Sequence, residues 1–189
     1  HDLNGAFIIL YAGNIGLSVD VDLVLDVAEQ LRDLPIRFVF VGDGVRAKGL
    51  ADEISRRDLS NVRYLGYQPQ EVAHLIYPSC DLAMIPMKAG TTTDTFPSKV
   101  YTILASGKAV LAAADEDSEL QWMIREWHCG RVVQPENRSE FEQAVRRAYA
   151  QRSLLDAEGE AGRLQVIAKY SKEAVGAQYD RLIAEIVRT

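Results

Sequence analysis

Short, continuous apolar segments alternate with amphipathic segments along most of this chain. Residues 7–11 read Phe-Ile-Ile-Leu-Tyr, which is typical of a parallel strand buried on both faces. Val21, Leu25, Ala28 and Leu31 then repeat at helical intervals. The alternation continues to residue 133, so we expect strands over 7–11, 36–41, 62–65, 82–85, 109–113 and 131–133. This pattern predicts an α/β fold, a parallel six-stranded sheet covered by helices on both faces.

The helices of this pattern are expected over about 45–57, 71–77 and 118–127, and three more close the chain over 139–149, 154–170 and 172–187. Ser171 is a plausible cap between the last two. Trp122, Met123 and Trp127 recur at helical spacing and are expected in the core or against the final helices. The alternative is that they face a missing domain.

Composition excludes several classes of function. The chain has 189 residues, 21 basic and 27 acidic side chains and a net charge of −6, which gives no support to a nucleic-acid partner. It contains no apolar run of membrane-spanning length and no export leader. Cys80 and Cys129 lack metal-ligand spacing and are expected to be small buried thiols. His74 and His128 have apolar neighbours and are expected to be structural.

Glycine-rich or polar loops follow four of the predicted strands. They are Gly13-Asn14-Ile15-Gly16, Gly42-Asp43-Gly44, Gly66-Tyr67-Gln68 and residues 88–96. Because ligands of open parallel sheets bind beyond the carboxyl ends of the strands, these loops are expected to converge on one site. Each glycine by itself could instead serve only a tight turn. The first loop lacks the Gly-x-Gly-x-x-Gly pattern, which disfavours a nicotinamide dehydrogenase.

Residues 94–112 form the most informative segment. The hydroxyl-rich loop 90–95 leads to Pro97 and Ser98, which are expected to supply a fixed φ and a capping oxygen for a helix that Gly107 ends. The free N–H groups at such a helix start, with the full charge of Lys99, predict an anion site. The plain alternative is an ordinary strand, loop and capped helix.

This segment, with Tyr11–Gly16, Phe38–Gly44 and Asn61–Gly66, resembles the C-terminal, donor-binding half of bacterial group 1 (family 4-like) retaining glycosyltransferases with the GT-B fold. The resemblance covers residues 7–179, and it is strongest to enzymes that build surface polysaccharides such as colanic acid. It implies a Rossmann-like nucleotide-sugar-binding domain that takes a UDP- or GDP-linked donor. The whole enzyme would then transfer a hexose, with retention, to a polysaccharide or lipid-linked acceptor.

The resemblance also implies roles for individual residues. Tyr67 and Gln68 would flank the base, and the backbone around Phe96 to Ser98 would hold the diphosphate. Asp94 and Thr102 fall where the family has two glutamates, and Thr102 would bind the ribose more weakly. The full set of expected binding residues is Gly13, Asn14, Gly16, Gly42, Asp43, Gly44, Tyr67, Gln68, Thr93, Asp94, Thr95, Phe96, Pro97, Ser98, Lys99 and Thr102. We assign no catalytic residue and expect neither a metal nor another cofactor.

Departures from the family leave an alternative open. Asn14 and Ser18 or Val19 stand where many relatives carry basic residues, and Asp20 would repel a diphosphate unless it points away. A degenerate, non-catalytic nucleotide-binding or scaffold module of the same fold is therefore the second hypothesis. A nucleotide-sugar epimerase is a poorer third, since no acid/base residues are found. The acidic residues Asp115, Glu116, Asp117 and Glu119 are interpreted as solvated surface.

We expect residues 1–6 to be a tag or linker remnant, 7–170 the nucleotide-sugar-binding domain, and 171–189 a helix that packs back toward a missing N-terminal, acceptor-binding domain. The isolated chain would then be inactive as an enzyme. The expected location is cytoplasmic, with peripheral attachment of the full-length protein to the inner membrane if the acceptor is lipid-linked.

Overall fold

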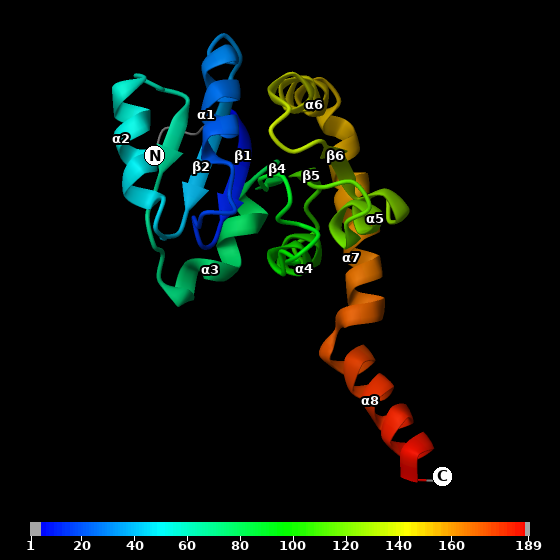
Figure 1. Ribbon diagram of the computed structural model, residues 1–189. Coiled ribbons are helices and arrows are strands. Elements are labelled where there is room, and N and C mark those ends of the chain that lie inside the picture. The colour runs from blue at the N-terminus through cyan, green and yellow to red at the C-terminus, as the bar shows by residue number, and fades with distance from the viewer. Residues whose placement is uncertain (1–4, 188–189) are drawn as a thin grey trace.

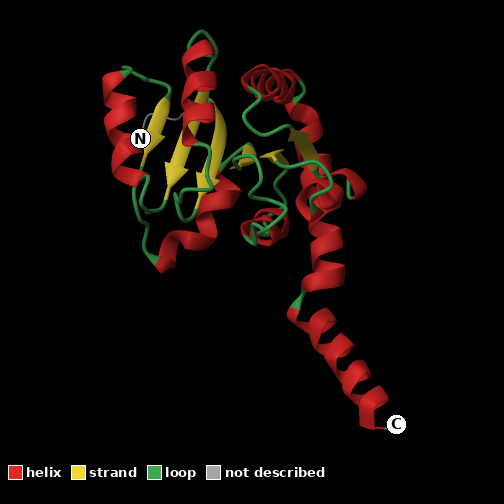
Figure 2. Ribbon diagram, in the orientation of Figure 1, coloured by secondary structure: helices red, strands yellow, loops and turns green. Residues whose placement is uncertain are grey.

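The computed structural model describes residues 5–187 and contains one six-stranded parallel sheet with helices on both faces (Figures 1 and 2). The strands are β1 (Phe7–Ala12), β2 (Ile36–Val41), β3 (Val62–Tyr64), β4 (Leu82–Pro86), β5 (Val110–Ala113) and β6 (Gly130–Val133). Their spatial order is β3-β2-β1-β4-β5-β6. Strand order therefore reverses between β1 and β4, and the predicted fold class is confirmed.

The helices are α1 (Val21–Gln30), α2 (Ala47–Arg56), α3 (Gln70–Ile76), α4 (Lys99–Ala105), α5 (Glu119–Glu126), α6 (Arg138–Ala150), α7 (Leu155–Tyr170) and α8 (Lys172–Val187), with short 3₁₀ turns at Tyr77–Ser79 and Arg152–Leu154. Local side-chain caps explain several starts. The Asp20 carboxylate accepts from the Leu23 N–H at 3.0 Å, and the Asn137 amide oxygen accepts from the Glu140 N–H at 3.1 Å. Each cap satisfies an N–H group that the helix cannot pair internally.

The strands divide the core into two layers, because successive side chains of a strand point to opposite faces of the sheet. Ile9, Tyr11, Phe38 and Phe40 pack with buried residues of α1 and α6 on one face. On the other face, residues of the same strands pack with α4, α5 and α7. Burial on both faces is the reason that the strands are apolar without alternation.

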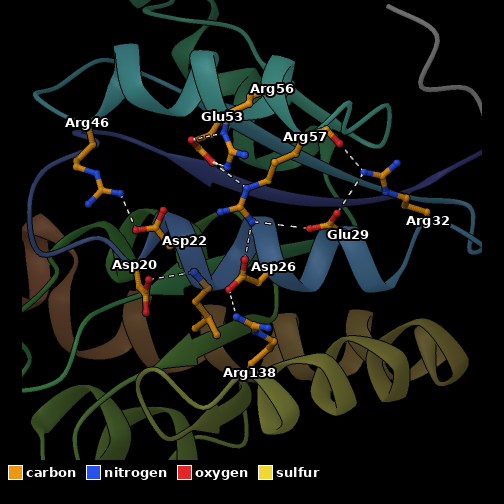
Figure 3. A network of polar contacts seen from close by, with 11 residues as sticks. Asp20, Asp22, Asp26, Glu29, Arg32, Arg46, Glu53, Arg56, Arg57 and Arg138 are labelled. Atoms are coloured by element: carbon orange, nitrogen blue, oxygen red, sulfur yellow. Dashed lines mark hydrogen bonds and ion pairs between the residues drawn. The ribbon is translucent and has the colours of Figure 1, made fainter.

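A partly buried network of ion pairs joins α1 to α2 and α6 (Figure 3). Arg57 contacts Asp26 at 2.5 Å and Glu53 at 2.8 Å, and Arg138 reaches the same Asp26 carboxylate. Arg46 pairs with Asp22 at 2.8 Å. These side chains lie between the covering helices, so the network stabilises their packing on one another.

Helix α7 lies directly against the end of α4 and is followed by a helix that leaves the body of the molecule. A Cβ atom added to Gly159 would lie only 2.1 Å from the Gly107 carbonyl oxygen, so this contact requires glycine. The Ser171 hydroxyl accepts from the Ala174 N–H at 3.2 Å, which confirms its predicted capping role. Helix α8 then projects away from the sheet (Figure 1), and none of its described side chains is buried.

The large apolar residues of α5 (Glu119–Glu126) and of its C-cap have two different environments. Met123 and Trp127 are buried as predicted, and the Trp127 ring lies 6.1 Å from that of Tyr170 at the end of α7. Trp122 is 54% exposed, so the prediction that it packs in the core or against the final helices was wrong. Its position on α5 falls on the solvent side, because the helix has only one stripe toward the sheet.

The remaining sequence predictions have mixed outcomes. Cys80 and Cys129 are free and buried, and burial raises the pKa of both thiols to about 12. His74 and His128 are exposed, so their apolar neighbours in sequence do not enclose them. Within residues 5–187, no helix combines the length and the apolar character needed to cross a membrane.

Candidate functional site

The sheet opens at its carboxyl edge where strand order reverses. Strands β1 and β4 pair only at Ile9–Leu82 and Leu10–Ala83, so their last residues diverge. The loop after β1 crosses this opening and joins the end of β4: the Asp20 N–H donates to the Pro86 carbonyl at 2.8 Å, and Val19 and Met87 form an antiparallel bridge. The divergence leaves room for a ligand at the position expected for this topology.

Backbone hydrogen bonds join the first loop to the loop after β2 at this edge. The Gly13 N–H donates to the Val41 carbonyl, and the Ile15 N–H donates to the Asp43 carbonyl at 2.8 Å. Gly42 adopts φ +127°, and a Cβ atom there would lie 2.0 Å from the Gly13 carbonyl oxygen. Gly42 is therefore required for the close approach of the first two loops. It serves a tight turn and also shapes the edge at which the candidate site lies.

Two adjoining pockets occupy this edge. The first, which we call the Lys99 pocket, has a volume of about 430 Å³ and is lined by Tyr11, Ala12, Gly13, Asn14, Ser18, Val19, Met87, Thr95, Phe96, Pro97, Ser98, Lys99 and Thr102. The second, the Tyr67 pocket, has about 360 Å³ and is lined by Ala12, Gly13, Asn14, Val41, Gly42, Asp43, Tyr67, Gln68 and Ile76. They share Ala12, Gly13 and Asn14, so the first loop forms a ridge between two parts of one cleft.

The structure thus brings together most of the predicted binding residues, from four separate loops. Gly16, Gly44, Thr93 and Asp94 belong to the same loops but are not among the described residues that line either pocket. A larger hollow of about 700 Å³ lies on α5, lined only by residues between 117 and 126. It gathers side chains from one short stretch of the chain, whereas the cleft gathers residues of four loops, so we place the candidate site at the cleft.

Lys99 reaches from the start of α4 across the sheet edge to β1. Its Nζ atom lies 3.6 Å from the centroid of the Tyr11 ring. No carboxylate of residues 5–187 lies within ion-pairing distance of this amine. Burial lowers the pKa of Lys99 from 10.5 to about 7. The expected full charge is therefore wrong for the free site near neutral pH, where the amine is close to half protonated.

The start of α4 differs from the sequence prediction. Ser98 itself has helical dihedral angles, φ −53° and ψ −19°, and its side chain makes no capping hydrogen bond. The Val100 N–H donates to the Pro97 carbonyl at 3.0 Å instead. The predicted capping oxygen was wrong because a cap residue needs extended backbone angles to turn its side chain toward the helix. The Gly107 stop is confirmed, with φ +68° directly after the helix.

Asp20 lies in the first loop, but its carboxylate is directed away from the candidate site. Asp20 is 6% exposed and caps α1, so its carboxylate is turned into the helix start and is absent from the pocket lining. Burial, the largest influence, raises the pKa of Asp20. From the sequence, Asp20 is expected to repel a diphosphate unless its side chain points away. Because the side chain does point away, Asp20 is no obstacle to an anion in the pocket.

Asp115 anchors the loop that carries Thr95 and Phe96. Its carboxylate accepts from the N–H groups of Gly90 at 2.7 Å and Thr92 at 2.8 Å, and from the Thr92 hydroxyl at 2.6 Å. Partial burial opposes ionisation, but these hydrogen bonds outweigh it and lower the pKa of Asp115. The interpretation of Asp115 as solvated surface was wrong. Its position directly beyond a buried strand, at the same edge as the loop, is the signal that identifies it.

Comparison with known proteins places this fold in a class: the chain is the Rossmann-like half of a GT-B glycosyltransferase fold. It superposes on Anabaena Alr3699/HepE, solved in complex with UDP and glucose, with a TM-score of 0.81 and 15% identity over 97% of this chain and 49% of that one. Sucrose-phosphate synthase from Thermosynechococcus elongatus gives 0.82 and 19%, over 97% and 46% of the two chains.

The family follows from the sequence match. Residues 2–165 match the family described as glycosyl transferases group 1, and the chain belongs to it. It is 32% identical over 113 residues to WcaI of Escherichia coli K12, named as a colanic acid biosynthesis glycosyl transferase, and 24% identical over 129 residues to the glycosyltransferase WbjE of Pseudomonas aeruginosa. These alignments cover 60% and 66% of this chain but only 28% and 32% of the two relatives.

Proposed function

We propose that this chain binds the nucleoside diphosphate of a UDP- or GDP-linked sugar in the cleft formed by the Lys99 and Tyr67 pockets. The observation that carries the proposal is a basic side chain, Lys99, in the wall of a pocket at the strand-order reversal of a group 1 glycosyl transferase chain. The diphosphate would lie against Lys99 and the first loop, and the base would lie beside Tyr67 and Gln68. Relatives of the same fold solved with UDP support this choice of ligand class.

In the whole protein, this half would serve a retaining transfer of a hexose to a polysaccharide or lipid-linked acceptor. The chemical demand of that reaction falls on the departing diphosphate, whose negative charge grows in the transition state. Lys99 would stabilise that charge by electrostatic preorganisation, which needs no protein nucleophile. Asp94, in the exposed loop before α4, would accept a hydrogen bond from the donor hexose once the sugar is bound.

The acceptor side would come from a second domain. The chain corresponds to about half the length of its solved relatives, such as HepE. Five large apolar side chains of the described part of α8 are more than half exposed: Tyr179, Leu182, Ile183, Ile186 and Val187. We propose that they pack against that second domain, because an apolar strip of this kind is costly to leave in water. The cytoplasmic location and inner-membrane attachment remain predictions.

The competing hypothesis is a degenerate module that has kept the fold and lost the site. Asn14 in place of a basic residue and Thr102 in place of a glutamate favour it. Against it, Asp20 is turned out of the pocket, and Thr102 lines the Lys99 pocket, where a longer carboxylate could reach a ribose.

Calorimetric titration with UDP, GDP and their sugars tests the proposal. We expect one nucleotide to bind saturably, and Lys99→Ala to weaken it by about tenfold or more, since a charge-assisted contact is lost. Lys48→Ala, at an exposed position of α2, is the matched control and should leave the affinity unchanged. Thr102→Glu should tighten binding by roughly 1–2 kcal/mol if the ribose lies beside it.

No binding across the panel at millimolar concentration would refute the proposal and favour the degenerate module. Among the described residues, no group of three or more His, Cys, Asp or Glu side chains could hold a metal ion. Metal-independent donor binding stays a prediction, which a titration in excess chelator would check.

A further inference from the structure

Tyr11 lies at the centre of the candidate site but was not among the residues predicted from sequence. It is the penultimate residue of β1 and is 0% exposed. Its ring packs 5.8 Å from that of Phe40 on β2, on the face of the sheet that α1 covers. Because β1 and β4 separate after Leu10, the ring lies beside the opening at the strand-order reversal rather than under a neighbouring strand.

Two contacts of Tyr11 link parts of the site that come from different loops. The face of its ring lies beneath the Lys99 ammonium group, 3.6 Å from the Nζ atom to the ring centroid. Its hydroxyl group donates a hydrogen bond of 2.5 Å to the carbonyl oxygen of Asn14 in the first loop. The amine also lies close to that loop, since a Cβ atom added to Gly13 would be 3.1 Å from Nζ.

The ring replaces the partner that a buried lysine normally needs. No carboxylate of the described chain pairs with Lys99, and the electron-rich face of an aromatic ring attracts a cation when water is excluded. A flexible lysine side chain without such a contact would lose much rotamer freedom on binding an anion. A side chain that is already held loses less, which favours binding.

We propose that Tyr11 is a positioning residue of the donor site: its ring holds the Lys99 ammonium group at the end of β1 while its hydroxyl fixes the first loop, so that both present one rigid surface to the diphosphate. This inference rests on the proposed function. It assigns Tyr11 a role through Lys99 and Asn14, without direct contact of the phenol with the reacting atoms.

A double-mutant cycle with UDP tests the inference, using Tyr11→Leu, Tyr11→Phe, Lys99→Met and the double variants, each checked for folding by urea denaturation. Tyr11→Leu should lower UDP affinity about tenfold by loss of the cation–π contact. Tyr11→Phe keeps the ring and should stay within about threefold of wild type, because only the loop hydrogen bond is lost. In the Lys99→Met background, the further effect of Tyr11→Leu should fall to no more than about threefold, the part due to the lost loop hydrogen bond, since coupled residues are not additive.

Phe40→Leu is the matched control. It removes a buried aromatic ring of the neighbouring strand, and any loss of affinity that it causes should be the same in the wild-type and Lys99→Met backgrounds. The inference is overturned if Tyr11→Leu behaves in the same way, with equal losses in both backgrounds. If wild type binds GDP and not UDP, the cycle is run with GDP. If wild type binds neither nucleotide, the proposed function fails and this inference with it; if wild type binds one of them and coupling is absent, only the inference fails.

A spectroscopic measurement covers the case in which Tyr11→Leu does not fold. In wild type and Tyr11→Phe, the ε-methylene protons of Lys99 should show an upfield ring-current shift in ¹H–¹³C spectra, assigned by their loss in Lys99→Met. Unshifted Lys99 resonances in wild type would show that the amine is not held over the ring and would overturn the inference.

Discussion

Lys99→Met should stabilise the chain at neutral and acidic pH, and the gain should disappear as the pH rises. Methionine has a similar length and carries no charge, so it removes the cost of burying an ammonium group. In the folded protein, burial lowers the pKa of Lys99 from 10.5 to about 7. Between these two values the unfolded chain binds a proton at this side chain and the folded protein does not.

The sign and size of the effect follow from proton linkage. Stability rises with pH wherever the unfolded state binds more protons, so Lys99 raises the free energy of unfolding between pH 7 and pH 10.5. The slope is about 1.4 kcal/mol per pH unit, and the difference over the whole window is about 5 kcal/mol. Below pH 7 both states are protonated, so the full cost applies there. The difference over the whole window is large in comparison with the free energy of unfolding of a typical domain, which is roughly 5–15 kcal/mol.

Urea denaturation of wild type and Lys99→Met at pH 6, 7, 8, 9 and 10 measures the effect. Taking the difference between the two proteins at each pH cancels the titration of all other groups, including Cys80 and Cys129 with their raised pKa values. We expect Lys99→Met to be the more stable protein at pH 6, and its advantage to shrink by about 4 kcal/mol between pH 7 and pH 10. A difference that stays constant across this range would refute the inferred burial of the amine.

Three further predictions concern the site and its supports. UDP binding at pH 8 should take up close to one proton in wild type and none in Lys99→Met. Calorimetry in buffers of different ionisation enthalpy measures this uptake. Equal uptake in both proteins would show that Lys99 is not the group that gains the proton. Asp115→Asn should lower the free energy of unfolding by about 2–3 kcal/mol at pH 7, because the donors of Thr92 and its neighbours lose a charged acceptor. The pKa of the Asp115 carboxyl in the folded protein lies below 3.8, so the difference in stability between the two proteins should vanish as the pH falls past that value. A difference that persists in acid would contradict this account. Gly42→Ala should destabilise the folded protein by about 3 kcal/mol or more in thermal unfolding. Gly49→Ala, in an exposed and open position of α2, should instead stabilise the folded protein by about 1 kcal/mol. Similar effects at both positions would argue against the close loop contact.

Much of the fold could be predicted from sequence because its signals are local. The run of apolar residues in β1 and the helical repeat that follows it each depend on neighbours within a few positions. The capping serine at Ser171 and the stop at Gly107 are also local, and both were predicted correctly. The predicted cap at Ser98 failed because its backbone is already helical, which residue type alone does not reveal.

The site could be predicted only in outline. The rule that parallel strands end at one edge correctly gathered the first loop, the Gly42 loop and the segment around Phe96. It could not show that Asp115 anchors that segment from the next strand, nor that Asp20 is turned into α1. Those outcomes depend on side-chain directions set by packing between elements.

Sequence by itself determined the class of fold, the family and the sheet edge at which the candidate loops gather, because these depend on periodicity, turn residues and motif order along the chain. The tertiary structure alone decided the state of the site. Tyr11 and Lys99 are far apart in sequence and meet only because β1 and β4 separate at the strand-order reversal. Burial of the amine at this position lowers its pKa, and the contact is the basis for the role proposed for Tyr11, since burial and partner geometry exist only once the chain has folded.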